Sequence, residues 1–346
     1  MTMKTIPIHC SKSYTVSVGE GLLSRCGEMT APLVRGRRAL LVAGGEVAPL
    51  YGETALASLR SAGFAAELLV IPGGEADKTP RRLISLLEAA AERQLGREDV
   101  FLALGGGAVC DTVGLAAALY ERGTGCVMLP CSLLAMVDAS VGGKTAVDLP
   151  QGKNLMGAFS QPAGVLCDTA LLASLPHRRY AEGMAEVIKM AFLSGADIPG
   201  DREEMIALCV ERKRAYVEAD EQDRGARRLL NLGHTLGHAA ELASGYALSH
   251  GDAVAIGMAT ICRGAVRKGL CDPESGNRLH ELLRRWDLPT GTDLPEAALF
   301  AALRMDKKST DGRIAAVIPR HWGLCECRNM DFSELEALLS AGREEA

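Results

Sequence analysis

The chain has 346 residues, of which 48% are apolar, 23% charged and 4% aromatic, and its formal net charge is -5. This composition is more typical of a folded α/β enzyme than of a disordered or fibrous protein, and the length is enough for two domains. The acidic balance and the lack of a basic block give no reason to expect nucleic acid or an acidic membrane surface as a partner.

The eleven cysteines are scattered and include no CxxC pair. An odd number of cysteines, mostly in apolar runs, indicates reduced core thiols and a cytoplasmic protein. The N-terminus lacks the apolar core of a signal peptide, and no run of eighteen apolar residues predicts a membrane span.

Strand and helix patterns alternate through the first part of the chain. After strand-like alternation in residues 1–20, strands are predicted at 38–44, 65–74, 99–107 and 125–130, and helices at 49–63, 79–96 and 108–123. Thr79 and Pro80 are a typical N-cap and first helical residue. This alternation predicts a parallel sheet with helices on both faces.

The pattern changes near Pro176, after which helical periodicity dominates. A strand-like sequence pattern returns only at residues 313–319 and 323–329. We therefore predict an α/β domain over 1–175 and a mostly helical domain over 176–346.

A glycine run lies between a predicted strand and helix in "LALGGGAVCD". Gly105, Gly106 and Gly107 would let a phosphate approach the backbone and the helix N-terminus, although a tight turn alone is the alternative. Asp111, one turn into the predicted helix, could cap the helix or orient a bound group, and a purely structural role is the alternative. The upstream turn "IPGGEADK" carries Glu75 and Lys78, which by themselves suggest solvated charges.

The segment "MVDASVGGKTAVDLPQGKNLMGAF" (136–159) carries Asp138, Lys144, Lys153 and Asn154 among glycines. We interpret it as a loop whose cations gather around a bound anion, with a solvated basic loop as the alternative.

Histidines suggest a metal site in "NLGHTLGHAAELASGYALSH". His234 and His238 have the i, i+4 spacing of a zinc-binding helix, and Arg227 and Asn231 extend the same polar stripe. His250 and the Glu186–Lys189 pair in "AEGMAEVIK" are further candidates. Spacing alone does not select the ligands.

Six motifs together resemble the 3-dehydroquinate synthase family of sugar-phosphate cyclases. They are "GGGAVCD", "VDASVGGKTAVDLPQGKN", "AEGMAEVIK", "LLNLGHTLGHAAE", "SHGDAVAIGM" and "DKK". The resemblance implies a Rossmann-like α/β domain, a helical C-terminal domain and an active site between them. It also implies conversion of 3-deoxy-D-arabino-heptulosonate 7-phosphate to 3-dehydroquinate and phosphate, in the shikimate pathway. The implied course is transient oxidation by NAD, phosphate elimination, reduction and intramolecular aldol closure.

The resemblance also implies the roles of individual residues. Glu186, His234 and His250 would hold one divalent metal, usually zinc, with cobalt as the alternative, and His238 would move protons near the substrate phosphate. Asp138, Lys144, Lys189, His238 and Asp223 match catalytic positions. Arg122 matches an arginine that reaches the partner's site in a homodimer. The matched substrate-binding positions are Arg122, Lys144, Lys153, Asn154, Lys213, Arg227, Asn231, His238, Lys307 and Lys308. The matched cofactor-binding positions are Glu75, Lys78, Gly105, Gly106, Gly107, Asp111, Cys131, Ser132, Asp138, Lys144 and Lys153.

Some positions depart from the family pattern. Cys131-Ser132 stands where Thr-Thr is common, Gly44-Gly45-Glu46 replaces residues that contact the adenosine side of the cofactor, and Asp223 and Asp252 each stand where Glu is usual.

The alternatives to a 3-dehydroquinate synthase are a valiolone- or inosose-type cyclase, a polyol dehydrogenase of the same fold, and a non-catalytic relative. The set of Arg227, Asn231 and His238 favours the synthase, because the other cyclases tend to lose it.

Overall fold

The computed structural model describes residues 3–306 and 313–343. The chain divides into two compact units: Met1–Pro176 with Gly200–Gln222, and His177–Pro199 with Asp223–Ala346. The sequence placed 200–222 in the second domain. These residues join the first unit because α6 (Arg202–Ala219) packs on strands β1 and β2 and buries Met205, Ile206 and Val210.

A seven-stranded sheet with the order β1-β2-β9-β6-β5-β3-β4 forms the core of the first unit within the described residues. Neighbouring strands are parallel, as predicted, except that β1 pairs antiparallel with β2. The strands are β1 (Lys4–Ile8), β2 (Tyr14–Gly19), β3 (Arg38–Gly44), β4 (Ala65–Ile71), β5 (Val100–Gly105), β6 (Gly125–Pro130) and β9 (Gly164–Asp168).

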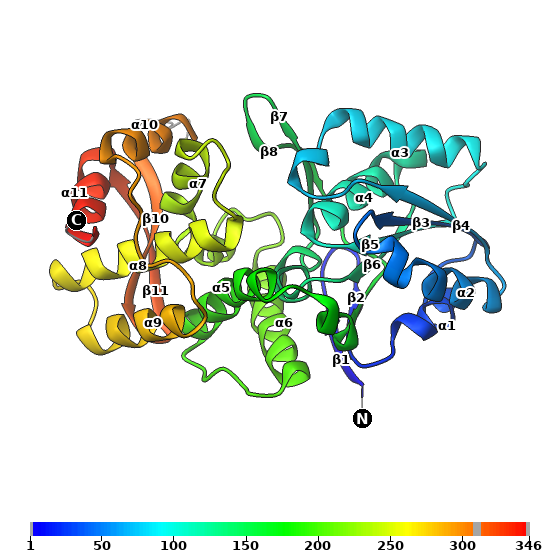
Figure 1. Cartoon of the computed structure of the whole chain (residues 1–346), viewed down its shortest axis with the longest axis horizontal. Coiled ribbons are helices and arrows are strands. Elements are labelled where there is room, and N and C mark those ends of the chain that lie inside the picture. Colours follow the sequence, from blue (N-terminus) through cyan, green and yellow to red (C-terminus); the bar gives the residue numbers. More distant parts are fainter. Residues whose placement is uncertain (1–2, 307–312, 344–346) are drawn as a thin grey trace. The chain divides into compact units, whose positions relative to one another are not determined.

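Helices cover both faces of this sheet, with α3 and α4 on one side and α1 and α2 on the other (Figure 1). The predicted cap is confirmed, since the Thr79 side chain accepts a hydrogen bond from the Arg82 amide and Pro80 begins α3. The helices are η1 (Leu23–Arg25), α1 (Cys26–Thr30), η2 (Ala31–Leu33), η3 (Ala48–Gly52), α2 (Glu53–Ser61), η4 (Glu75–Asp77), α3 (Pro80–Glu92), α4 (Gly107–Leu119), η5 (Tyr120–Arg122), η6 (Ala135–Ala139), η7 (Thr169–Ser174) and α6.

The segment 136–159 is mostly a β-hairpin, so the expectation of a loop is wrong. Strands β7 (Lys144–Leu149) and β8 (Gly152–Phe159) pair antiparallel around a tight turn. Val147 and Ala146 are buried, whereas Leu155, Met156 and Phe159 on β8 are exposed. The buried face of β7 packs on α4, which supplies the tertiary support that a lone hairpin lacks.

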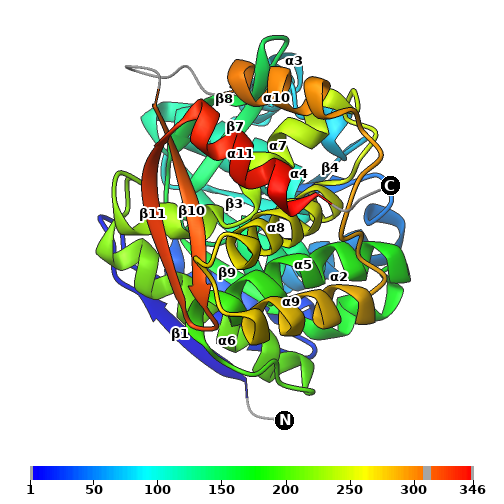
Figure 2. The ribbon, with the colours of Figure 1, turned by 90° about the vertical axis from the view of Figure 1, so that its left-hand side faces the viewer.

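The second unit is mostly helical, as predicted, and α8 (His250–Arg267) lies in its middle (Figure 2). Helix α8 packs against α5, α7, α9, α11 and β10, and most of its residues are buried. The predicted strands near 313 and 323 form an antiparallel pair. The elements are α5 (His177–Ser194), η8 (Ala226–Asn231), α7 (His234–Ala243), α8, α9 (Pro273–Arg285), α10 (Glu296–Asp306), β10 (Arg313–His321), β11 (Leu324–Asp331) and α11 (Phe332–Gly342).

In the part of the chain that the structure describes, no helix combines the length and the apolar character needed to cross a bilayer.

Candidate functional site

Helices α5, α7 and α8 of the second unit bring three potential metal ligands together. Glu186 lies on α5, His234 begins α7 and His250 begins α8. Glu186 Oε1 lies 3.7 Å from His234 Nε2 and 3.6 Å from His250 Nε2. One ligand atom from each residue lies within 4.8 Å of the others. This is the ligand set that the family resemblance implied.

The close approach of α8 to α5 depends on a glycine. A Cβ at Gly251 would lie 2.4 Å from the carbonyl oxygen of Glu182. Two further interactions fix the N-terminus of α8. The Ser249 hydroxyl accepts a hydrogen bond from the Asp252 amide, and the Asp252 carboxylate forms an ion pair with Arg178 of α5. Asp252, a departure from the family pattern, thus joins the two helices that carry Glu186 and His250.

The environment of Glu186 tests whether a cation fits this cluster. The residue is 1% exposed, and Oε1 makes no hydrogen bond within the described residues. Burial would raise the pKa of Glu186, but the adjacent Lys189 ammonium and His250 outweigh it and hold the pKa at about 2. A buried carboxylate kept ionised with an unsatisfied oxygen, beside two imidazole nitrogens, is a donor set suited to zinc or a similar divalent metal.

His234 and His238, the candidates with i, i+4 spacing, do not belong to the same three-residue ligand group in the described residues. The two rings are perpendicular, with centroids 5.4 Å apart. His238 instead groups with Glu241 and His250. Glu241 was not predicted, although it lies seven residues after His234 and therefore on the same face of α7.

The predicted polar stripe from Arg227 to His238 is not one continuous helix. Arg227 and Asn231 lie on the 3₁₀ helix η8, and Gly233, with φ of +80°, separates it from α7. Arg227 is 1% exposed and so faces no open water.

Three other predicted site residues lie outside this stripe. Asp223 adopts φ of +55° just before this segment. Lys307 and Lys308 lie outside the described residues.

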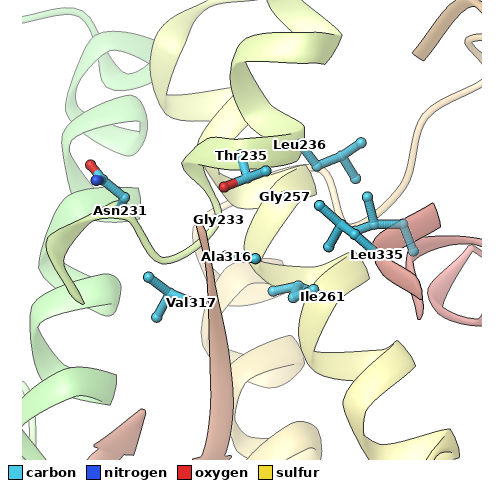
Figure 3. Close-up of a pocket in the computed structure, with 10 residues that line it drawn as sticks. Asn231, Gly233, Thr235, Leu236, Gly257, Ile261, Ala316, Val317 and Leu335 are labelled. Atoms are coloured by element: carbon cyan, nitrogen blue, oxygen red, sulfur yellow. The ribbon is translucent and has the colours of Figure 1, made fainter. Parts of the chain in front are cut away.

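A small cavity lies beside this segment in the second unit (Figure 3). Asn231 lies at one end, and Leu236 and Leu335 lie at the other. Its volume is about 10 Å³, room for about one water molecule and too little for a sugar phosphate.

In the first unit, glycines gather where β3, β4 and β5 end. A Cβ at Gly73 would lie 3.4 Å from Gly44 Cα, and one at Gly105 would lie 2.7 Å from Val109. Gly106 is the N-cap of α4, and Gly107 is its first residue. The strand order reverses between β3 and β5, the position where doubly wound sheets bind dinucleotides. The glycines at 44 and 45 therefore lie at the edge of this cradle.

Lys78 connects this cradle to the hairpin. It is 4% exposed, and its ammonium lies 2.6 Å from Asp111 of α4 and contacts Asn154 of β8. The reading of this turn as solvated charge is therefore wrong for Lys78. Burial would lower the pKa of Lys78, but Asp111 and neighbouring acids outweigh it and raise that pKa. Glu75 is half-exposed and lies 3.4 Å from Lys153.

Asp138 and Lys213, of which Lys213 is buried, form a second ion pair in the first unit. The Lys213 ammonium donates to the Asp138 carboxylate at 2.5 Å and to its carbonyl oxygen at 2.7 Å. This pair joins α6 to η6, which explains further why α6 belongs to the first unit.

Cys131 and Ser132 lie beside the glycine cradle. Cys131 is buried and its amide donates a hydrogen bond to the Gly105 carbonyl, while the Ser132 hydroxyl lies near the position of Gly106.

Arg122 and Lys144 are exposed in this unit. Arg122 has a φ of +62° and follows Glu121 with a φ of +51°. Two successive non-glycine residues in the left-handed region are uncommon and cost energy. The turn thus holds Arg122 on the surface in a strained conformation.

Comparisons with known proteins agree with this architecture. Models of the 3-dehydroquinate synthase N-terminal and C-terminal domains match residues 68–182 and 183–309. The chain is 42% identical to 3-dehydroquinate synthase of Xanthomonas oryzae pv. oryzae, over 93% of this chain and 94% of that one.

Solved structures share the whole fold. A 2-epi-5-epi-valiolone synthase from Streptomyces hygroscopicus subsp. jinggangensis, with NAD⁺ and Zn²⁺ bound, is 29% identical with a TM-score of 0.86, covering 97% of this chain and 98% of that one. A 2-deoxy-scyllo-inosose synthase complexed with carbaglucose-6-phosphate, NAD⁺ and Co²⁺ is 23% identical with a TM-score of 0.88, covering 98% and 100%. The sequence and both domain models agree that the chain belongs to the 3-dehydroquinate synthase family.

Proposed function

We propose that this chain converts 3-deoxy-D-arabino-heptulosonate 7-phosphate to 3-dehydroquinate and phosphate. The observation that carries the proposal is the cluster of Glu186, His234 and His250 in a chain of this family. Other sugar-phosphate cyclases share the fold, but the identity of 42% to a 3-dehydroquinate synthase exceeds the 29% and 23% to the two other cyclases. A 3-dehydroquinate synthase activity is therefore favoured over the valiolone- and inosose-type cyclase activities.

Glu186, His234 and His250 would hold the divalent metal. Three protein ligands leave a position open for a substrate oxygen, as catalytic zinc sites do. Zinc suits the carboxylate and two imidazoles, and cobalt accepts the same ligands. The ammonium of Lys189 contacts Glu186 and is 1% exposed, so it would balance this carboxylate and lie within reach of substrate oxygens at the metal.

The glycine cradle at β3, β4 and β5 would hold NAD. Gly105, Gly106 and Gly107 would let the pyrophosphate approach the N-terminus of α4. Lys78 and Asp111 would fix the cradle wall, and Glu75, Ser132 and Lys153 would line it. Bound in this cradle, NAD would supply reversible hydride transfer, and a metal held by Glu186, His234 and His250 would supply Lewis acidity.

The remaining residues would bind and orient the substrate. It carries a phosphate and a carboxylate, which require several cations and hydrogen-bond donors. Asp138, held by Lys213, would orient hydroxyl groups, and His238 would move a proton near the phosphate. Asp223 would act near the metal. The anion-binding set would comprise Lys144, Lys153, Asn154, Lys189, Lys213, Arg227, Asn231, Lys307 and Lys308.

We further propose a cytoplasmic homodimer in which Arg122 reaches the partner's site. Exposed apolar side chains at Leu119 on α4 and Leu155, Met156 and Phe159 on β8 support a buried surface between copies. The described cysteines are all free thiols, which suits a reducing compartment.

Phosphate release from 3-deoxy-D-arabino-heptulosonate 7-phosphate tests the function. We expect release that needs both NAD⁺ and Zn²⁺, is abolished by a chelator and by His250→Ala, and leaves no net NADH. Lack of release from protein shown to hold metal and NAD would reject this substrate, and other sugar phosphates would then be assayed for the alternative cyclases.

A further inference from the structure

A buried carboxylate outside the ligand set faces one of the ligands. Glu241 lies on α7 and is 1% exposed. Its Oε1 lies 3.5 Å from Nδ1 of His250, whose Nε2 lies 3.6 Å from Glu186 Oε1. The two nitrogens of one imidazole therefore each face a different buried carboxylate.

This arrangement distinguishes the two nitrogens chemically. A neutral imidazole carries one N–H donor and one lone pair. If Nε2 offers its lone pair to a metal beside Glu186, Nδ1 must carry the proton and can donate it to Glu241. A carboxylate in this position fixes both the tautomer and the ring orientation of a metal-binding histidine.

We propose that Glu241 is a positioning residue for the metal centre. It holds His250 with Nε2 toward Glu186 and His234 and increases metal affinity without binding the metal. This inference rests on the proposed metal set. It also gives α7 two tasks, since the helix supplies the ligand His234 and, two turns later, the carboxylate that orients the ligand of α8.

The competing arrangement is a second cation held by His238, Glu241 and His250, which also form a compact group. It would need His250 to give up both ring protons in order to bind one metal through each nitrogen. A neutral histidine has one lone pair to offer, so a single metal with Glu241 as hydrogen-bond acceptor is favoured.

The test compares Glu241→Gln and Glu241→Ala with wild type by zinc competition against a chelator and by the visible spectrum of the Co²⁺ form. We expect zinc affinity to fall about 10–100-fold in Glu241→Ala, with a changed cobalt spectrum. Glu241→Gln is isosteric, and its amide oxygen can still accept from Nδ1, so a smaller loss is expected. Thr260→Val is the control, because it changes a buried polar residue that lies beyond His250 on α8. It should leave the zinc affinity and the cobalt spectrum unchanged.

Unfolding in excess chelator separates positioning from general damage. Metal-free Glu241→Gln should unfold near wild type in excess chelator, although the same variant binds zinc more weakly than wild type does. Affinity within twofold of wild type and an unchanged cobalt spectrum in both variants would overturn the inference. So would two metals per chain in wild type and one in Glu241→Ala, because Glu241 would then be a ligand. His234→Ala tests the metal set itself: if it retains metal, the proposed centre fails, whereas if it alone loses metal, only the role of Glu241 fails.

Discussion

Gly257 of α8 lies directly against the carbonyl oxygen of Gly233, the residue that precedes α7. A Cβ added at Gly257 would lie 1.8 Å from that oxygen. Helices α7 and α8 carry His234 and His250 at their first positions, so this contact sets the separation between two of the proposed ligands.

Gly257→Ala should therefore weaken metal binding as well as the fold. The methyl group must push backbone away rather than a flexible side chain, and we expect a loss of about 1–3 kcal/mol in the free energy of unfolding. Zinc affinity, measured by chelator competition, should fall with it. Gly200→Ala is the matched control, because a Cβ there meets nothing within 4 Å. Equal zinc affinity in both variants would show that this contact does not set the ligand spacing.

The Lys78–Asp111 pair predicts a pH dependence of stability. Burial outweighs the attraction of Lys78 and raises the pKa of Asp111 to about 6, against about 3.9 for an unfolded aspartate. The folded chain therefore holds this proton more tightly than the unfolded chain. Its contribution to stability is full below about pH 4 and is lost as the pH rises through about 6.

Asp111→Asn removes this titration. The free energy of unfolding of wild type minus that of Asp111→Asn should fall by about 2 kcal/mol from pH 4.5 to 7.5. Urea unfolding at both pH values measures the change. A difference that is constant with pH, or that grows as the pH rises, would contradict a raised pKa.

Thiol reactivity should follow burial. Cys327 is exposed and Cys10 is half-exposed, whereas the other nine of the eleven cysteines are buried. Burial also raises the pKa of Cys126 to about 12 and that of Cys26 to about 11, which keeps both as unreactive thiols. Titration with a thiol-specific chromogenic disulfide at pH 8 should modify about two thiols rapidly and all eleven after denaturation. Rapid modification of five or more in native protein would show that the core opens.

A mixing experiment tests whether Arg122 acts across the proposed dimer. Arg122→Ala and His250→Ala should each be inactive alone. After the two are unfolded together in equal amounts and refolded, half of the dimers are mixed, and each has one site with His250 and a partner's Arg122. About a quarter of wild-type activity should return. If Arg122 served its own subunit, no site would be complete and no activity would return.

The alternation of strands and helices in the first 130 residues was predictable because each element carries a local signal. The buried run 38–44 and the capped helix at Thr79 both form as expected. The hairpin at 144–159 was misread as a loop. Its glycines and lysines obscure the strand pattern, and its β8 strand leaves Leu155 and Met156 exposed, so no alternation of buried and exposed residues marks it.

The site was less accessible to sequence reasoning, because its partners are distant along the chain. Glu186 and His250 are separated by 64 positions, and only the packing of α8 on α5 brings them together. Lys78 looked like a solvated charge because nothing local shows that Asp111 and Asn154 close over it. Glu241 did have a signal, since it shares a helical face with His234 and His238, but a lone glutamate at that spacing is usually a surface residue.

The proposed ligands Glu186, His234 and His250, together with Glu241, all belong to one compact unit, whereas the glycine cradle and Lys78 belong to the other. The two chemical requirements are therefore encoded in separate parts of the molecule. Substitutions that change which dinucleotide is preferred can accumulate in the first unit while the metal chemistry stays intact. Under the proposed assignment, metal binding and dinucleotide binding should therefore be separable, so that a substitution in one unit removes one of them and leaves the other in place.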